Sequence, residues 1–125
     1  MKEFADPDTP LCYNRNPMTD KPQDDPVLKR FRAAVTEIYA DRLERVVLFG
    51  SRARGDATEN SDYDVAVFLR DMGDRMAEMN RLADLSTDIL YDMGEFIHAM
   101  PYRAGFHNDV REPLMHEIRT EGIDL

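Results

Sequence analysis

Apolar side chains along this chain follow two patterns, one typical of helices and the other typical of buried strands. Apolar positions three or four residues apart predict three helices, at Pro26 to about Ala40, Asp71 to Asp92 and Pro113 to Gly122. Short uninterrupted apolar runs predict three strands, at Glu44–Phe49, Tyr63–Leu69 and Glu95–Met100. A short helix is expected at 51–58, and Pro101 is expected to end the third strand.

The ordered part of the chain is predicted to begin at Asp25 and Pro26. Aspartate is a favoured N-cap residue, and proline is favoured at the first helical position. Residues 1–25 contain four prolines and show no apolar periodicity, so we expect a flexible, proline-rich and acidic N-terminal arm. Residues 26–125 then form one domain, because 125 residues suffice for a single core.

Helices and strands alternate along residues 26–125, and this order predicts an α/β fold with a small sheet flanked by helices. A net charge of −9 argues against a nucleic-acid clamp, which needs a basic surface to neutralise phosphates. The single cysteine, Cys12, excludes an intramolecular disulfide and a cysteine-clustered metal site. No apolar run approaches the ~18–20 residues that cross a bilayer, so we expect no membrane partner and a cytoplasmic location.

The residues that suggest chemistry surround the segment between the first two predicted strands. Gly50 follows the first strand, and a glycine there allows a phosphate to approach the backbone closely. Ser51 adds a hydroxyl donor, and the following amides lie at the start of the short helix. Asp62 and Asp64 are two residues apart in an extended segment, so both carboxylates are expected on one face, where they can share divalent cations.

The order of these features resembles the signature of a known family. Gly-Ser-Arg-Ala-Arg-Gly-Asp-Ala at 50–57, followed by Ser-Asp-Tyr-Asp-Val-Ala-Val at 61–67, is similar to the motif of the minimal nucleotidyltransferases. These belong to the DNA polymerase β-like nucleotidyltransferase superfamily, alongside kanamycin nucleotidyltransferase. The resemblance covers about 26–125 and implies the nucleotidyltransferase fold, in which a small mixed sheet is flanked by helices.

The resemblance also implies a role for each residue of the motif. Gly50 and Ser51 would hold the β- and γ-phosphates of ATP or another nucleoside triphosphate. Asp62 and Asp64 would be catalytic and would bind two Mg²⁺ ions, which stabilise the attacking and leaving oxygens while an acceptor hydroxyl attacks the α-phosphate.

Two arginines and a tyrosine also belong to the motif. Arg52 and Arg54 would contact the triphosphate, or else form ion pairs with an acidic neighbour, for which the sequence offers Asp56, Glu59 and Asp62. Tyr63 is interpreted as a packing residue that faces away from the metals.

The third predicted strand departs from the family pattern. Active members usually carry a third carboxylate there, whereas our register places His98 at that position and Glu95 on the opposite face. His98 is either a metal ligand or proton acceptor, or a half-buried strand residue bonded to a neighbouring helix. Loss of a carboxylate would weaken the binding of a hard divalent ion.

The sequence is compatible with three functions. The first is transfer of AMP to a tyrosine of a helical HEPN toxin encoded nearby, with this chain as the antitoxin. The second is an antitoxin with reduced catalysis that neutralises its partner by binding alone. The third is a transferase that modifies a small hydroxylated molecule such as an aminoglycoside, with a homo-oligomer completing the pocket.

Overall fold

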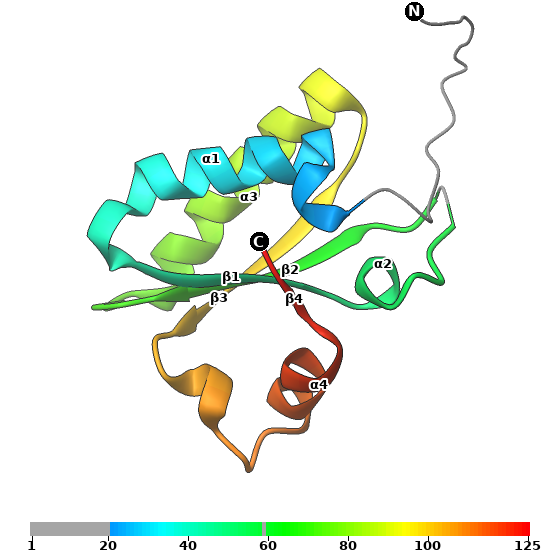
Figure 1. Ribbon diagram of the computed structural model, residues 1–125. Coiled ribbons are helices and arrows are strands. Elements are labelled where there is room, and N and C mark those ends of the chain that lie inside the picture. Colours follow the sequence, from blue (N-terminus) through cyan, green and yellow to red (C-terminus); the bar gives the residue numbers. More distant parts are fainter. Residues whose placement is uncertain (1–20, 59) are drawn as a thin grey trace, which may run out of the picture.

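The computed structural model describes residues 21–58 and 60–125, and a four-stranded mixed sheet lies at its centre (Figure 1). The strands are β1 (Leu43–Phe49), β2 (Tyr63–Leu69), β3 (Ile97–Arg103) and β4 (Ile123–Asp124). Their order in the sheet is β3-β2-β1-β4, with β1 antiparallel to both of its neighbours and β2 parallel to β3.

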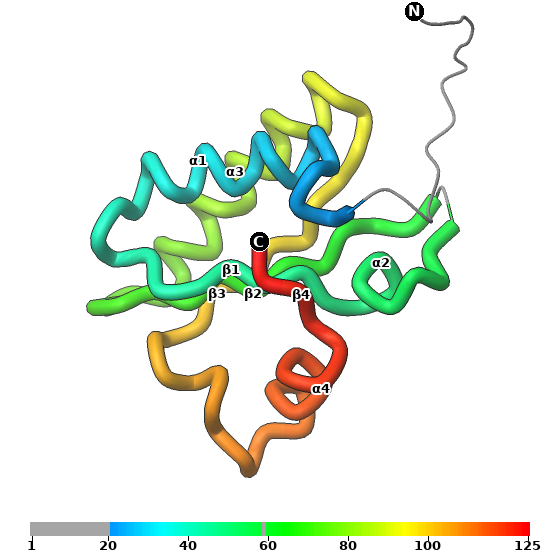
Figure 2. Tube along the Cα trace, viewed as in Figure 1, coloured from blue at the N-terminus to red at the C-terminus, as the bar shows by residue number. Residues whose placement is uncertain are grey.

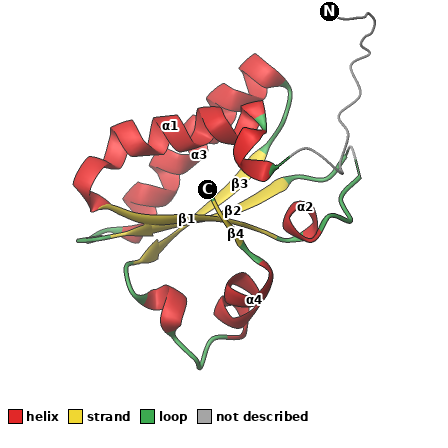
Figure 3. Cartoon of the chain, viewed as in Figure 1, coloured by secondary structure: helices red, strands yellow, loops and turns green. Residues whose placement is uncertain are grey.

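Helices cover both faces of this sheet (Figure 3). The long helices α1 (Pro26–Tyr39) and α3 (Arg75–Met93) lie on one face, and α4 (Pro113–Glu121) lies on the other. The short helix α2 (Ser51–Arg54) follows β1, and 3-10 turns are formed at Pro22–Asp24 (η1), Ala40–Arg42 (η2) and Phe106–Asn108 (η3). The predicted α/β fold, a small mixed sheet flanked by helices, is confirmed.

The central strand β2 is buried on both sides, and its side chains alternate between two apolar clusters. Val65 belongs to the cluster that includes residues of α1 and α3, whereas Ala66 and Phe68 belong to the cluster formed with α4. Successive strand residues point to opposite faces. Tyr63 therefore belongs to the α1 face, where it is buried, and Asp64 belongs to the α4 face.

The first helix begins where the sequence predicts. Asp25 is the N-cap residue of α1, and its Oδ1 accepts a hydrogen bond of 2.8 Å from the backbone N–H of Val27. Phe31 and Val35, one helical turn apart, are fully buried against the sheet. The apolar spacing read from the sequence is thus the buried stripe of α1.

The predicted ends of two elements were wrong. β3 does not stop at Pro101 but continues to Arg103, because β3 is an edge strand of the described sheet, where the missing N–H of a proline does not interrupt the ladder. The helix expected at 51–58 ends at Arg54, because Gly55 takes a left-handed conformation with φ of 86°. Its N–H closes the helix by donating to the carbonyl of Ser51 at 3.0 Å.

The strand β4 was missed by sequence reasoning, since two residues carry no periodic signal. Figure 2 shows the C-terminal segment returning to β1, where Ile123 pairs with Leu48 and Asp124 with Val47. Gln23 of η1 also reaches this edge, donating from Nε2 to the carbonyl of Asp124 at 3.0 Å.

Most of the predicted N-terminal arm, residues 1–20, lies outside the described residues, and so does Cys12. Residues 22–24 form η1 directly before the cap of α1. None of the helices in the described part of the chain is both long and apolar enough to cross a bilayer.

Candidate active site

The turn after β1 brings its backbone against a carboxylate of β2. Phe49, the last residue of β1, pairs with Asp64 in the antiparallel register. Gly50 follows with φ of 78° and ψ of −158°, a conformation that is essentially restricted to glycine. A Cβ at position 50 would lie 2.5 Å from Asp64 Oδ2. Glycine is therefore required here both by the backbone conformation and by the close approach of Asp64.

The short helix α2 continues from this turn as a single turn of helix. The amides of Ala53 and Arg54 both donate to the carbonyl of Gly50 at 3.1 Å. Ser51 is the first residue of α2 and is half-buried. The Gly-Ser turn is thus held by its own backbone bonds directly beside Asp64.

Two carboxylates flank a buried tyrosine at the start of β2. Asp62 is exposed immediately before the strand, and the Asp64 side chain is 36% exposed. Tyr63 between them is only 2% exposed and lies in the core on the α1 face. The prediction that Tyr63 is a packing residue is confirmed.

The neighbouring strand places a histidine where a third carboxylate was expected. β2 and β3 are parallel with Asp64 opposite His98, and His98 Nδ1 lies 3.7 Å from Asp64 Oδ1. The imidazole is 60% exposed beside Asp64. Glu95 does not join them, because its Oε1 lies 3.8 Å from Arg52 Nη2.

The two arginines of the motif have different surroundings. The Arg52 side chain is only 15% exposed, and its guanidinium contacts the carbonyl of Ser61 and the ring of Tyr63. The Arg54 side chain is 40% exposed, with Nε 3.3 Å from Asp56 Oδ2 and Nη1 3.4 Å from Glu121 Oε1. Of the ion pairs that the sequence offered, the structure shows the one between Arg54 and Asp56, and Glu59 lies outside the described residues.

The donor set suits magnesium better than a transition metal. Magnesium prefers oxygen ligands, keeps several waters and is bound in many enzymes by one or two carboxylates together with substrate phosphates. Asp62 and Asp64 supply carboxylates open to solvent, and the lack of a side chain at Gly50 allows the Asp64 carboxylate to lie directly against the turn. Within 21–58 and 60–125 no group of three or more His, Cys, Asp or Glu side chains is arranged to hold a metal ion.

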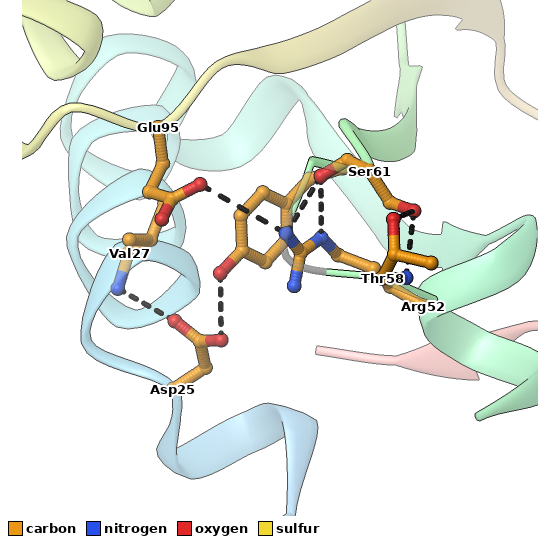
Figure 4. A network of polar contacts seen from close by, with 7 residues as sticks. Asp25, Val27, Arg52, Thr58, Ser61 and Glu95 are labelled. Atoms are coloured by element: carbon orange, nitrogen blue, oxygen red, sulfur yellow. Dashed lines mark hydrogen bonds and ion pairs between the residues drawn. The ribbon is translucent and has the colours of Figure 1, made fainter. Parts of the chain in front are cut away.

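Sequence reasoning missed the polar network that supports this site (Figure 4). Tyr63 donates its hydroxyl to Asp25 Oδ2 at 2.9 Å, which connects β2 to the cap of α1. Ser61 Oγ accepts from the backbone N–H of Thr58 at 3.0 Å. The N-cap signal at Asp25 was visible in the sequence, but nothing local indicates that Tyr63 shares its carboxylate.

Comparison with known proteins agrees with this geometry. A family model described as a nucleotidyltransferase domain matches residues 28–119. "Putative protein adenylyltransferase MJ0141" of Methanocaldococcus jannaschii is 46% identical over 101 residues, covering 79% of this chain and 95% of that protein. "Putative protein adenylyltransferase MJ0604" of the same organism is 37% identical over 73 residues, covering 58% of this chain and 67% of that protein.

Solved structures share the fold at low sequence identity. One, titled a "putative nucleotidyltransferase from Sulfolobus solfataricus", has a TM-score of 0.55 at 19% identity and covers 78% of this chain and 75% of its own. Another, a toxin–antitoxin with AMP-PNP, has a TM-score of 0.55 at 20% identity and covers 77% and 70%. The family model spans Gly50, both aspartates and His98, and the chain belongs to the nucleotidyltransferase domain family.

Proposed function

We propose that this chain is a Mg²⁺-dependent adenylyltransferase that transfers AMP from ATP to a tyrosine hydroxyl of a HEPN toxin and so acts as its antitoxin. The close approach of the Asp64 carboxylate to the Gly50 turn carries the proposal, because phosphates bound at that turn would lie beside a carboxylate able to bind a metal ion. The names of the relatives support a protein acceptor, and the toxin–antitoxin neighbour supports a toxin partner.

In the proposed reaction the acceptor oxygen attacks the α-phosphorus of ATP. The new bond joins that oxygen to the α-phosphorus, the bond from the α-phosphorus to the β-bridging oxygen breaks, and pyrophosphate leaves. The hydroxyl proton is released to water, to which Asp62 and His98 are open. Gly50 and Ser51 would orient the β- and γ-phosphates, and Asp62 and Asp64 would hold the magnesium ions, whose chemistry when bound would be electrostatic stabilisation of the transferred phosphate.

The test uses ATP labelled at the α-phosphate, the purified chain, Mg²⁺ and the protein encoded by the neighbouring gene. We expect label on that protein, no label from ATP labelled at the γ-phosphate, and no transfer in EDTA. The variant Asp62→Asn with Asp64→Asn should reduce transfer by at least 10²-fold, because it removes the charge that binds the metal.

A matched control removes two carboxylates elsewhere. Asp84→Asn with Asp88→Asn changes two exposed residues of α3, the helix on the sheet face opposite Asp64. This variant should transfer label at the wild-type rate. Equal transfer by both double variants would exclude the assigned site, and no transfer by the wild-type protein would exclude the enzymatic function.

The donor set also favours a second candidate, an antitoxin that neutralises its partner by binding alone. His98 lies opposite Asp64 where active relatives are expected to carry a carboxylate. In that case the wild-type chain would form a stable complex and suppress the toxin without transferring label. The Asp62→Asn, Asp64→Asn variant would then suppress the toxin as well as the wild type does.

A further inference from the structure

Arg52 forms hydrogen bonds to the backbone directly before Asp62, the exposed carboxylate of the site. Its Nε and Nη2 both donate to the carbonyl oxygen of Ser61, at 3.0 and 2.6 Å. Ser61 is directly followed by Asp62. Two bonds from one planar guanidinium to one oxygen restrict where that peptide group can lie.

The same guanidinium also contacts the residue after Asp62. The Arg52 Cζ lies 4.0 Å from the centre of the Tyr63 ring, within the range of a cation–π contact. Tyr63 is itself anchored, because its hydroxyl donates to Asp25 Oδ2 at 2.9 Å and its N–H donates to the carbonyl of Phe96 at 3.1 Å. Arg52 therefore touches both neighbours of Asp62 and connects them to α2.

The guanidinium of Arg52 lies on the side of β2 that faces away from Asp64. Tyr63 and Asp64 point to opposite faces of β2, so a guanidinium stacked on the Tyr63 ring lies on the face that Asp64 does not share. Glu95 Oε1, 3.8 Å from Nη2, provides a countercharge on this side. The Arg52 side chain is 15% exposed, whereas that of Arg54 is 40% exposed.

We propose that Arg52 is a positioning residue that fixes the peptide groups around Asp62, and that it is not a ligand of the triphosphate. The proposal depends on the proposed function only in taking Asp62 as a metal ligand. Residues that orient metal ligands typically change metal affinity by about 10–100-fold when they are replaced. Loss of the Arg52 contacts should therefore weaken metal binding even when no nucleotide is present.

The experiment measures Mn²⁺ binding by titration calorimetry without nucleotide, and ATP binding in EDTA, for the full chain. In Arg52→Met, which keeps a long unbranched side chain, and in Arg52→Lys, which keeps the charge, we expect Mn²⁺ affinity to fall at least tenfold. ATP binding in EDTA should stay within about twofold of the wild-type value. Arg30→Met, at an arginine of α1 whose side chain is 37% exposed and pairs with Asp92, should bind Mn²⁺ as the wild type does.

Hydrogen exchange of the backbone amides of 61–64 supplies a second readout. These amides should exchange faster in both Arg52 variants, while the amides of α1 and α3 stay protected, which a general loss of stability would not produce. If Arg52→Met does not fold, the same comparison in Arg52→Lys decides the question, since its planar contacts are lost with the charge retained.

The outcomes separate this proposal from the proposed function. Unchanged Mn²⁺ affinity in the Arg52 variants, with affinity lost in Asp62→Asn, would overturn the positioning role alone. A fall in ATP binding in EDTA with intact Mn²⁺ binding would identify Arg52 as a triphosphate ligand instead. Wild-type Mn²⁺ affinity in Asp62→Asn would remove the metal assignment, and the positioning role would fall with it.

Discussion

Replacing Gly50 by alanine would put a methyl group between the turn after β1 and the carboxylate of Asp64. The added Cβ would lie 2.5 Å from Asp64 Oδ2, whereas real Cβ atoms essentially never come closer than 3.0 Å to another heavy atom. Either the turn or the carboxylate must then move by about 0.5 Å. A functional site holds its groups to within roughly this tolerance, so we expect metal binding to suffer directly.

The cost to folding has two parts. A non-glycine residue at φ of 78° and ψ of −158° costs roughly 1–3 kcal/mol. The contact itself adds less than about 1 kcal/mol, because the clashing atom is the end of a side chain that is 36% exposed and can turn away. We therefore expect Gly50→Ala to lower the free energy of unfolding by about 1–3 kcal/mol.

Urea unfolding measures this change, and titration calorimetry with Mn²⁺, well below the unfolding midpoint, measures the effect on the site. We expect Mn²⁺ affinity to fall at least tenfold, because the carboxylate of Asp64 is displaced. Gly55→Ala is the matched control, since Gly55 also has a positive φ, of 86°, but a Cβ there would meet no atom within 4 Å.

The control separates backbone strain from the contact with Asp64. Gly55→Ala should cost about 1–2 kcal/mol of stability from its left-handed conformation, and Mn²⁺ affinity should not change. If Gly50→Ala bound Mn²⁺ as tightly as the wild type, or if both variants lost the same affinity, the steric reasoning would be refuted.

Three further substitutions test other parts of the molecule. His98→Asp adds a carboxylate opposite Asp64 and should tighten Mn²⁺ binding several-fold in calorimetry, and unchanged affinity would contradict the register argument. Burial, the largest single influence, raises the pKa of Glu78, but its interactions with Arg42 (hydrogen bond of 2.8 Å), Tyr39 and Arg81 together outweigh burial and lower that pKa from its usual value of 4.5. Glu78 therefore stabilises the fold above about pH 4.5, and this contribution is lost as the pH falls through the lowered pKa. Between about pH 6 and about pH 3 the wild type should lose more stability than Glu78→Gln in urea unfolding, and equal losses would contradict this. Asp25→Ala removes the cap of α1 and should cost about 2 kcal/mol in the same assay, whereas the exposed neighbour in Asp24→Ala should cost little. Similar losses in these two variants would show that the cap contributes nothing.

Local patterns were sufficient to predict the elements with long buried faces. In α1, β1 and β2 the apolar side chains are the ones that become buried, so the spacing of apolar residues indicates both the type of element and its buried face. The predicted end of β3 was wrong because a proline ends a strand only where its missing N–H would have bonded to a neighbouring strand. That neighbour is decided by the order of the sheet, which no short segment contains.

The site could be predicted as a set of residues but not as an arrangement. Counting along an extended strand put Asp62 and Asp64 on one face, and it put His98 and Glu95 on opposite faces of the third strand. Such counting works because the side-chain period of a strand is two. It does not give the partner of Glu95, which the structure shows to be Arg52 across the Tyr63 ring.

The amino-acid sequence alone determined the family motif and the alternation of helices and strands, whereas the pairing of His98 with Asp64 depends on the order of the strands in the sheet. Only the tertiary structure showed that Gly50 lies against the Asp64 carboxylate and that Arg52 contacts both neighbours of Asp62. The reason is physical. Secondary structure and strand period follow from interactions between residues close in the chain, whereas these contacts form only after antiparallel pairing and helix packing bring separate segments together.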